Sequence, residues 1–250
     1  MSTEKKSFFA VMKSYNKNFR VASVMELFER WAWYGLFAVL ALYLTGSTDE
    51  GGLGFSHIEK GQIMGIVTAI LYLLPMITGV IADKIGYKLS LIIAYLLLIS
   101  GYYVMGEVQS YTMVFIVFLW VAVGAAMFKP VASAIITKNT DESNSTLGFG
   151  IFYMMVNIGG FIGPAFSSTL RTKYGWKIIF LQAAIVIAIN LIILLIFYKE
   201  KDRKKKFNEL LKKIAGEIQH LPGTLRKHYL LPEIEHNFYA HGSIGRVPKI

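Results

Sequence analysis

The stretch YTMVFIVFLWVAVGAAMFKPVASAII, residues 111–136, is an apolar run with a single charged residue, Lys129. A helix needs roughly 20 mostly apolar residues to cross a bilayer, so this run is long enough to do so. Its residues do not alternate between polar and apolar, as those of a membrane-barrel strand would. The run therefore predicts a transmembrane helix with one charge in its second half.

Five similar runs are separated from it and from each other by short connectors rich in turn-forming residues. Helices satisfy their backbone hydrogen-bonding groups internally, as the bilayer interior requires. We therefore predict an all-α integral membrane protein with a cytoplasmic N-terminal segment at 1–21, a bundle at 22–198 and a tail at 199–250. The six predicted spans are Ala22–Thr45, Gln62–Ala82, Leu89–Gly106, Tyr111–Ile136, Leu147–Leu170 and Trp176–Tyr198.

The composition excludes most soluble proteins and offers little to an enzyme. Hydrophobic residues make up 54% of the chain and charged residues only 17%, against about 25% charged residues in a typical globular domain. Cysteine is absent, so disulfides and thiolate sites are excluded. Four of the five histidines lie after residue 199 without clear metal-ligand spacing. We therefore predict a protein that is not an enzyme and holds neither metal nor cofactor.

The net charge of +10 is concentrated in the tail. Residues 1–198 contain 14 basic and 10 acidic side chains, whereas residues 199–250 contain 12 and 6. A basic tail beside a membrane segment favours anionic lipid head groups as its partner over nucleic acid. Apolar residues at helical spacing predict an amphipathic helix over about residues 204–221. That helix would lie in the membrane interface or dock on the protein's own loops.

The distribution of Lys and Arg predicts the orientation. If the N-terminus is cytoplasmic, the inner segments hold 14 positive residues and the outer loops hold four. Positive charge favours the cytoplasmic side, and an even number of spans returns the chain to it. The expected location is the plasma (inner) membrane, with multiple spans and both termini cytoplasmic.

The first span carries Glu26, Glu29 and Arg30. At 100° per residue these three side chains share one helix face. A charge at the centre of a span costs roughly 2.5–3.5 kcal/mol even on the lenient scale, so these groups should face the bundle interior or a water-filled cavity. Alternatively, they reach cytoplasmic water by snorkelling.

Lys129 is the second informative charge because apolar residues precede it for many positions. It precedes Pro130, which frees a backbone carbonyl and can kink the helix toward a cavity. A lysine there calls for a carboxylate partner, and Glu26 and Glu29 are the plausible ones. Alternatively, the span ends near Phe128 and Lys129 lies at the membrane interface.

The segment GVIADKIGYK, residues 79–88, resembles the G-x-x-x-D-x-x-G-x-[KR] loop of the major facilitator superfamily. A related Gly163-Pro164 and Tyr174–Lys177 pattern occupies the corresponding place in the second group of three spans. The resemblance implies the N-terminal half of a major facilitator fold, built as a 3+3 inverted repeat. It also implies that Gly79, Asp83, Gly86 and Lys88 form a structural or gating loop.

Three further segments resemble the proton-coupled oligopeptide transporters of that superfamily. They are ELFERWAWYG at 26–35, FKP at 128–130 and FYMMVNIGG at 152–160, and the resemblance covers about residues 20–200. It implies that Glu26, Glu29, Arg30 and Lys129 couple protons to transport, with Lys129 in a salt bridge to a glutamate. It also implies that peptide is contacted by Trp33, Tyr34, Tyr72 and Asn157.

The sequence departs from the family pattern at three residues and in its length. Trp31 replaces Phe, Trp33 replaces the first of two tyrosines, and Val131 replaces the Asn that follows Lys-Pro. The expected function is the N-terminal half of a symporter for di-/tripeptides or peptide-like solutes, working by alternating access and driven by the proton gradient. Two alternatives stay open: a facilitator for another small solute, or a truncated fragment that transports nothing. A lone half would expose its cavity face unless it pairs with a second half or a copy of itself.

Overall fold

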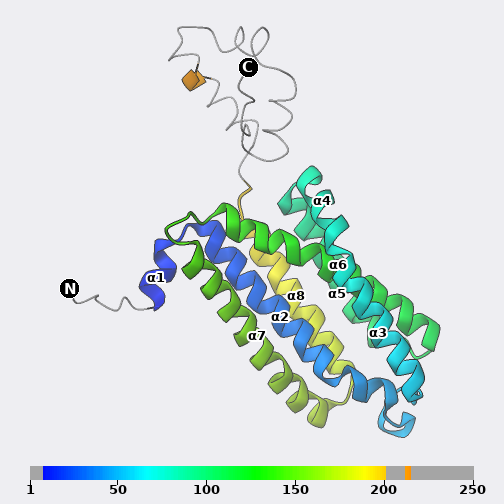
Figure 1. Cartoon of the computed structure of the whole chain (residues 1–250). Helices are drawn as coiled ribbons and strands as arrows, with labels where there is room; N and C mark the ends of the chain where they lie inside the picture. The colour runs from blue at the N-terminus through cyan, green and yellow to red at the C-terminus, as the bar shows by residue number, and fades with distance from the viewer. Residues whose placement is uncertain (1–7, 201–211, 215–250) are drawn as a thin grey trace. The chain divides into compact units, whose positions relative to one another are not determined.

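The structure is a computed structural model that describes residues 8–200 and 212–214, all helical or irregular (Figure 1). Residues 1–198 form one compact unit and residues 199–250 another. In the second unit only 212–214 are described among the residues beyond Glu200, and they are helical; the rest of the predicted amphipathic helix lies outside the described residues. The helices are α1 (Phe8–Ser14), α2 (Lys17–Thr45), the 3-10 helix η1 (Thr48–Glu50), α3 (His57–Leu73), α4 (Pro75–Ile85), α5 (Tyr87–Met105), α6 (Tyr111–Lys138), α7 (Ser145–Tyr174) and α8 (Lys177–Phe197).

The predicted spans correspond to α2, the pair α3 and α4, and then α5, α6, α7 and α8. The second span is not a single straight helix, because it bends by 44° between α3 and α4. Pro75 is the first residue of α4, and a proline has no N–H to continue the hydrogen-bond ladder. The predicted connector 83–88 was too long, since only Gly86 separates α4 from α5.

Side-chain caps define several helix starts. The side chain of Asn16 accepts a hydrogen bond from the N–H of Phe19 at the start of α2. Ser56 and Glu59 form a reciprocal capping box at the start of α3, in which each side chain accepts a hydrogen bond from the backbone N–H of the other residue. Ser110 caps α6 in the same way as Asn16 caps α2. These polar cap residues lie in the connectors and define where α2, α3 and α6 begin.

Helix α2 packs against α7 and α8, and α6 packs against α3, α4 and α5. These two sets of contacts become equivalent when the first three spans are exchanged with the last three. The pairs α2–α6 and α5–α8, which such an exchange maps onto themselves, are also in contact. The packing therefore has the symmetry of a 3+3 repeat, and Figure 1 shows α2 lying between α7 and α8.

The turn between the second and third spans and the turn between the fifth and sixth spans each contain a glycine with positive φ. Gly86 between α4 and α5 has φ 95°, and Gly175 between α7 and α8 has φ 81°. A side chain at such a positive φ is strained, whereas glycine adopts it freely. The side chains around the two turns differ: Tyr87 donates to Asp83 at 2.9 Å, and the Arg171 guanidinium lies 4.1 Å from the Trp176 ring centroid.

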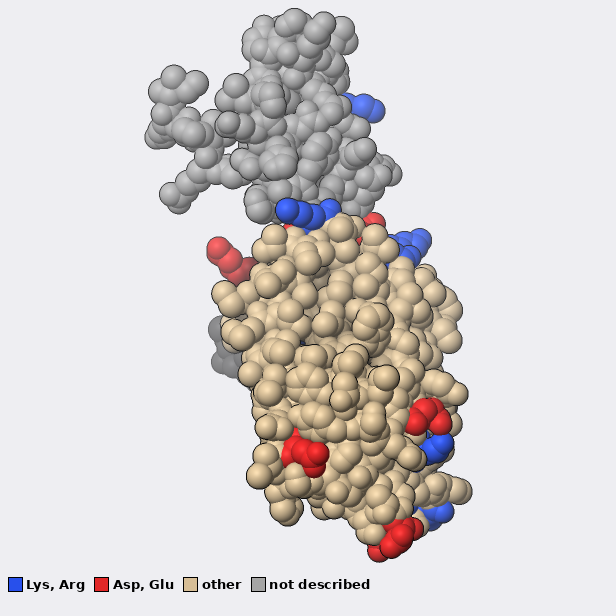
Figure 2. Space-filling model, turned by 90° about the vertical axis from the view of Figure 1, so that its right-hand side faces the viewer, with Lys and Arg blue, Asp and Glu red and all other residues tan. Residues whose placement is uncertain are grey.

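Within residues 8–200 and 212–214, four helices, α5 to α8, are long and apolar enough to cross a membrane, and the bent α3–α4 pair makes a fifth if it is counted as one span. Helix α2 is not among them, although it was predicted as the first span. Its middle carries Glu26, Glu29 and Arg30, which lower its mean hydropathy. Its position explains how these charges are tolerated, because 16 of its residues are buried. Figure 2 shows the outer face of the bundle uncharged through its middle, with charged side chains toward its two ends.

Candidate functional site

The charged face of α2 is a buried ion cluster. Glu26, Glu29 and Arg30 are 1%, 0% and 6% exposed. The Arg30 Nε lies 3.5 Å from Glu26 Oε1, and the same guanidinium pairs with the Glu29 carboxylate. Side chains that snorkelled to water would be exposed, so that alternative is wrong. The cluster is an interior feature of the bundle.

Beside this cluster lies a pocket of about 130 Å³ between α2, α3, the start of α4 and α6. Five of the eight predicted coupling and substrate residues line it: Arg30, Trp33, Tyr34, Tyr72 and Lys129. The remaining wall comes from Phe37, Thr68, Leu71, Pro75, Ala125 and Ala126. Helices far apart in sequence therefore bring the predicted groups to one cavity.

Lys129 does not form the predicted salt bridge. It is exposed on α6, and Arg30 rather than Lys129 pairs with Glu26 and Glu29. Its charge nevertheless acts electrostatically on both Glu26 and Glu29. Arg30 occupies the position expected for Lys129 because it lies on the same helix face as both acids. Helix α6 continues through Pro130 to Lys138, so Lys129 lies within a continuous helix; the alternative that the membrane span ends near Phe128 stays open.

The aromatic residues of the pocket differ in what they present. Tyr34 is 37% exposed and Tyr72 is 71% exposed, and the Arg30 guanidinium lies 5.7 Å from the Tyr34 ring centroid. Trp33 is only 7% exposed, and its ring stacks on Phe37 and Phe118 at 5.5 and 6.3 Å between centroids. The two tyrosines therefore line the pocket with accessible side chains, while Trp33 is part of its packed wall.

Asn157 stands apart from this pocket. It is exposed on α7 and is not among the pocket-lining residues. Its helix neighbour Gly160 faces Tyr34, because a Cβ added at Gly160 would lie 3.3 Å from the tyrosine ring. The structure thus places Asn157 on α7, which packs against α2.

The residues proposed as a gating loop form the end of α4 and the start of α5. Gly79 lies inside α4, and a Cβ there would meet Pro130 of α6 at an ordinary 3.7 Å. Gly86 is the turn itself, and Asp83 accepts from the Tyr87 hydroxyl at 2.9 Å. Lys88 lies in the first turn of α5. The motif is therefore a tight helix–turn–helix corner rather than an extended loop.

Two kinds of residue contribute to the site without being among the predicted site residues. A Cβ at Gly159 or Gly163 of α7 would lie 2.4 Å from a backbone carbonyl oxygen of α2, so these glycines allow the helices to cross closely. Their spacing of four residues was the signal. The second kind is polar and buried in apolar helices: Tyr95 and Tyr102 on α5 and Asn190 on α8, all 0% exposed. No periodic pattern distinguishes these three from neighbouring core residues.

No group of three or more His, Cys, Asp or Glu side chains that could hold a metal ion is found over residues 8–200 and 212–214.

Comparison with known proteins agrees with this arrangement. The family model of the Major Facilitator Superfamily matches residues 22–241. The chain is 31% identical over 173 residues to the uncharacterized transporter YclF of Bacillus subtilis, covering 67% of this chain and 35% of that protein. It is 28% identical over 165 residues to a di-/tripeptide transporter of Lactococcus lactis subsp. lactis, covering 64% of this chain and 33% of that protein.

Solved structures of transporters share the fold. A POT family transporter in complex with 5-aminolevulinic acid matches with a TM-score of 0.69 and 25% identity, over 93% of this chain and 51% of that one. The peptide transporter POT in complex with sulfate matches with the same TM-score and 24% identity, over 93% of this chain and 50% of that one. The chain spans about a third of the length of these curated relatives and about half of these solved structures. The relatives are transporters rather than enzymes, and the chain is a multi-pass membrane protein that belongs to the Major Facilitator Superfamily.

Proposed function

We propose that this chain is the N-terminal half of a proton-coupled symporter that takes up di-/tripeptides or peptide-like solutes by alternating access. The observation that carries the proposal is the buried Glu26–Glu29–Arg30 cluster, one member of which, Arg30, also lines the pocket. The names of the relatives support the substrate class, since one is a di-/tripeptide transporter.

The cluster has the charge balance of a proton site. With both acids ionised it holds two negative charges and one positive charge away from water. Burial disfavours an uncompensated charge, so binding one proton to a carboxylate brings the cluster to neutrality. Arg30 keeps a partner in either state, because it pairs with both acids. Proton binding therefore changes the cluster's charge without removing the guanidinium's partner.

The pocket then senses this change through Lys129. When both acids are ionised, their field offsets the lysine's positive charge, since Lys129 interacts electrostatically with each of them. When a proton neutralises one acid, Lys129 presents a less compensated positive charge to the pocket. A peptide carries a terminal carboxylate that pairs with such a cation. Proton and substrate are thus expected to favour each other's binding.

The peptide itself would be held by Tyr34 and Tyr72, whose side chains are accessible in the pocket. Trp33 would contribute an apolar wall, and Asn157 would act from α7 in the assembled cavity. Alternating access would rock this half against a second half around the binding site. The corner at Gly79, Asp83, Gly86 and Lys88 would guide that motion at the cytoplasmic side of the plasma membrane, where we place both termini. The proton gradient would be the energy source, with no cofactor.

A facilitator for another small solute is the second candidate, and the departures from the family pattern favour it. Trp33 is packed into the pocket wall and offers no hydroxyl. Val131, where the family pattern has an asparagine, is fully buried. At Trp33, which lines the pocket, a peptide backbone therefore meets no hydroxyl where the family pattern would supply one.

The test is uptake of a radiolabelled dipeptide, under an inward proton gradient, by proteoliposomes that contain a complete transporter bearing this half. We expect gradient-driven uptake that unlabelled di- and tripeptides compete away, and its loss in Glu26→Gln, Glu29→Gln and Lys129→Ala. Counterflow exchange without a gradient should persist in the two glutamate variants. Lys60→Ala is the matched control and should transport normally, because Lys60 lies in the first turn of α3 and does not line the pocket.

Three results would contradict the proposal. Uptake that continues under a proton gradient in all three variants would refute the coupling role. Uptake that peptides do not compete would favour the facilitator. No uptake or exchange by the chain, alone or with an added second half, would favour a fragment that transports nothing.

A further inference from the structure

A hydrogen bond between α4 and α6 lies next to the pocket. The Thr78 Oγ1 donates to the backbone carbonyl of Ala126 at 2.8 Å, and both residues are buried. Other helix hydroxyls, such as those of Thr45, Ser90 and Thr137, donate to the carbonyl four residues earlier in their own helices. The Thr78 hydroxyl instead reaches the backbone of a second helix.

The Ala126 carbonyl is the one that Pro130 leaves without its usual backbone donor. In an α-helix the N–H of each residue donates to the carbonyl four residues earlier, so residue 130 would serve residue 126. Proline has no N–H, and its ring also pushes against that carbonyl. Helix α6 nevertheless continues through Pro130 to Lys138. The Thr78 hydroxyl therefore supplies the donor that position 130 cannot supply.

The backbone of α4 also faces the proline ring itself. A Cβ added at Gly79, the residue after Thr78, would lie 3.7 Å from the Pro130 Cβ, which is ordinary contact. Two successive residues of α4 therefore meet the two features that the proline creates on α6, the free carbonyl and the ring.

The bond joins the helix faces that line the pocket. Residues three apart share a helix face, so Ala126 and Lys129 lie on one face of α6. By the same spacing, Pro75 and Thr78 lie on one face of α4. Ala126, Lys129 and Pro75 all line the pocket. The bond therefore fixes the pocket wall within one helical turn of the lysine.

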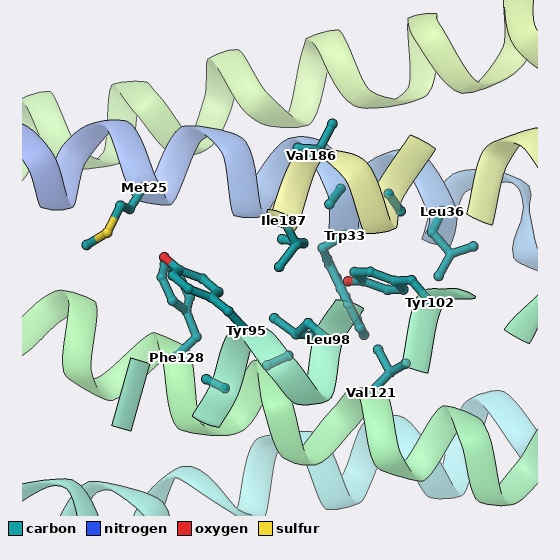
Figure 3. Close-up of a cluster of buried hydrophobic side chains, with 14 of the residues drawn as sticks. Met25, Trp33, Leu36, Tyr95, Leu98, Tyr102, Val121, Phe128, Val186 and Ile187 are labelled. Carbon is teal, nitrogen blue, oxygen red and sulfur yellow. The ribbon is translucent and has the colours of Figure 1, made fainter. Parts of the chain in front are cut away.

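The opposite face of α6 is held by the apolar core. Phe128 lies about 200° around the helix from Ala126, and its ring packs against Tyr95 of α5 with 5.7 Å between centroids. Figure 3 shows Phe128 and Val121 of α6 in the core cluster with Tyr95. Apolar packing is not directional, whereas a hydrogen bond weakens steeply away from its preferred angle. The Thr78 bond therefore adds the directional contact that fixes how far α6 is rotated about its own axis.

We propose that Thr78 is a positioning residue for Lys129. By donating to the carbonyl that Pro130 leaves free, it sets the rotation of α6 and keeps the Lys129 ammonium at the pocket. Thr78 does not line the pocket itself, so it acts through α6. This role rests on the proposed function, in which Lys129 pairs with the terminal carboxylate of the peptide.

The bond is tested by a double-mutant cycle on the stability of the full chain, measured by denaturant titration in mild detergent. Thr78→Val keeps the shape of the side chain but removes the donor. We expect it to lower the folding equilibrium constant about tenfold, because a buried carbonyl without a donor is costly. In a Pro130→Ala background the new N–H of residue 130 can reach the Ala126 carbonyl, so the same substitution should lower the constant about threefold or less. Equal losses in the two backgrounds would overturn the proposal.

Positioning is tested by calorimetric titration of a dipeptide into a complete transporter bearing this half. Thr78→Val should raise the dissociation constant about fivefold, because a displaced lysine pairs less well with the carboxylate. Thr78→Ser keeps the hydroxyl and should restore both stability and binding. In a Lys129→Ala background, Thr78→Val should weaken binding no further, since its effect passes through the lysine. Unchanged binding in Thr78→Val, or no recovery in Thr78→Ser, would overturn the positioning role.

The matched control is Thr137→Val, because Thr137 is exposed on α6 and its hydroxyl donates within its own helix at 3.0 Å. It should leave stability and peptide binding unchanged. If Thr78→Val does not fold, folding of the Thr78→Val/Pro130→Ala variant would support the proposal, and its failure to fold would count against it. The stability cycle needs no transport, so coupling between residues 78 and 130 in a transporter that binds no peptide would refute only the proposed function. Proton-driven peptide uptake without that coupling would refute only this inference.

Discussion

Replacing Gly159 with alanine should separate α2 from α7 and destabilise the protein. A Cβ at Gly159 would lie 2.4 Å from the Leu27 carbonyl oxygen and 2.8 Å from the Arg30 Cβ. Both neighbours belong to α2, and the first is backbone, so neither can swing aside as the end of a flexible side chain could. Restoring ordinary contact requires the two helices to move apart by about 1 Å, which opens the tightest crossing in the bundle.

The expected cost follows from two opposing effects. Overpacking of this kind costs about 1–3 kcal/mol, while alanine gains up to about 1 kcal/mol over glycine inside a helix. We therefore expect Gly159→Ala to lower the free energy of unfolding by about 1–2 kcal/mol. Because Arg30 Cβ is one of the displaced atoms, the same variant should also weaken gradient-driven uptake.

Gly150 provides the matched control on the same helix. A Cβ added there meets nothing within 4 Å, so Gly150→Ala should be neutral or slightly stabilising. Unfolding is measured by tryptophan fluorescence during a denaturant titration in mild detergent, since Trp31 packs against Phe166 of α7 and reports on this crossing. Equal midpoints for the two variants would refute the close-packing argument.

Three further perturbations test other parts of the structure. Arg30→Gln leaves two buried carboxylates without their cation and should destabilise the protein by about 3–5 kcal/mol at neutral pH. Denaturant titrations at several pH values should show that part of this lost stability is recovered in acid, where the carboxylates are neutral. A loss of stability that does not depend on pH would contradict this prediction. Gly86→Ala places a side chain at φ 95° and should lower the free energy of unfolding by about 1–2 kcal/mol in the same titration. Gly79→Ala is the control and should not lower it. Equal losses of stability in the two variants would show that the φ value is not the cause. Hydrogen bonds donated by the side chains and backbone of Ser143 and Asn144 lower the pKa of Asp141 from 3.8. The stabilisation from this exposed carboxylate is therefore present above the pKa of the unfolded chain and is lost as pH falls through the lowered pKa of the folded protein. Asp141→Asn should abolish that part of the acid dependence of stability, and an unchanged acid profile would count against this explanation.

The arrangement of spans was largely predictable because it follows from the length and composition of each run. The bilayer imposes that length, so α5 to α8 closely match the predicted ranges. The 44° bend was not predicted, although Pro75 marks its position. A proline can start a new helix segment or kink an existing one, and only packing against α6 decides between these outcomes.

The candidate site was predictable where one helix face determines it and not where two helices must be aligned. The shared face of Glu26, Glu29 and Arg30 follows from helix periodicity, and the structure brings the three together. The predicted partner for Lys129 was wrong, because the rotation of α6 about its own axis depends on how it packs. Tyr95 and Asn190 were missed because a buried polar residue in an apolar run looks the same in sequence whether or not it lies beside a charge.

The ion pairs of α2 join residues of a single helix, and this has a consequence for how any motion could be triggered. When a salt bridge joins two helices, breaking it allows the helices to separate. Here both carboxylates and the guanidinium belong to α2, so gaining or losing a proton breaks no contact between two helices. The signal must instead pass outward as a change of electric field, felt by whatever cation or anion occupies the neighbouring cavity.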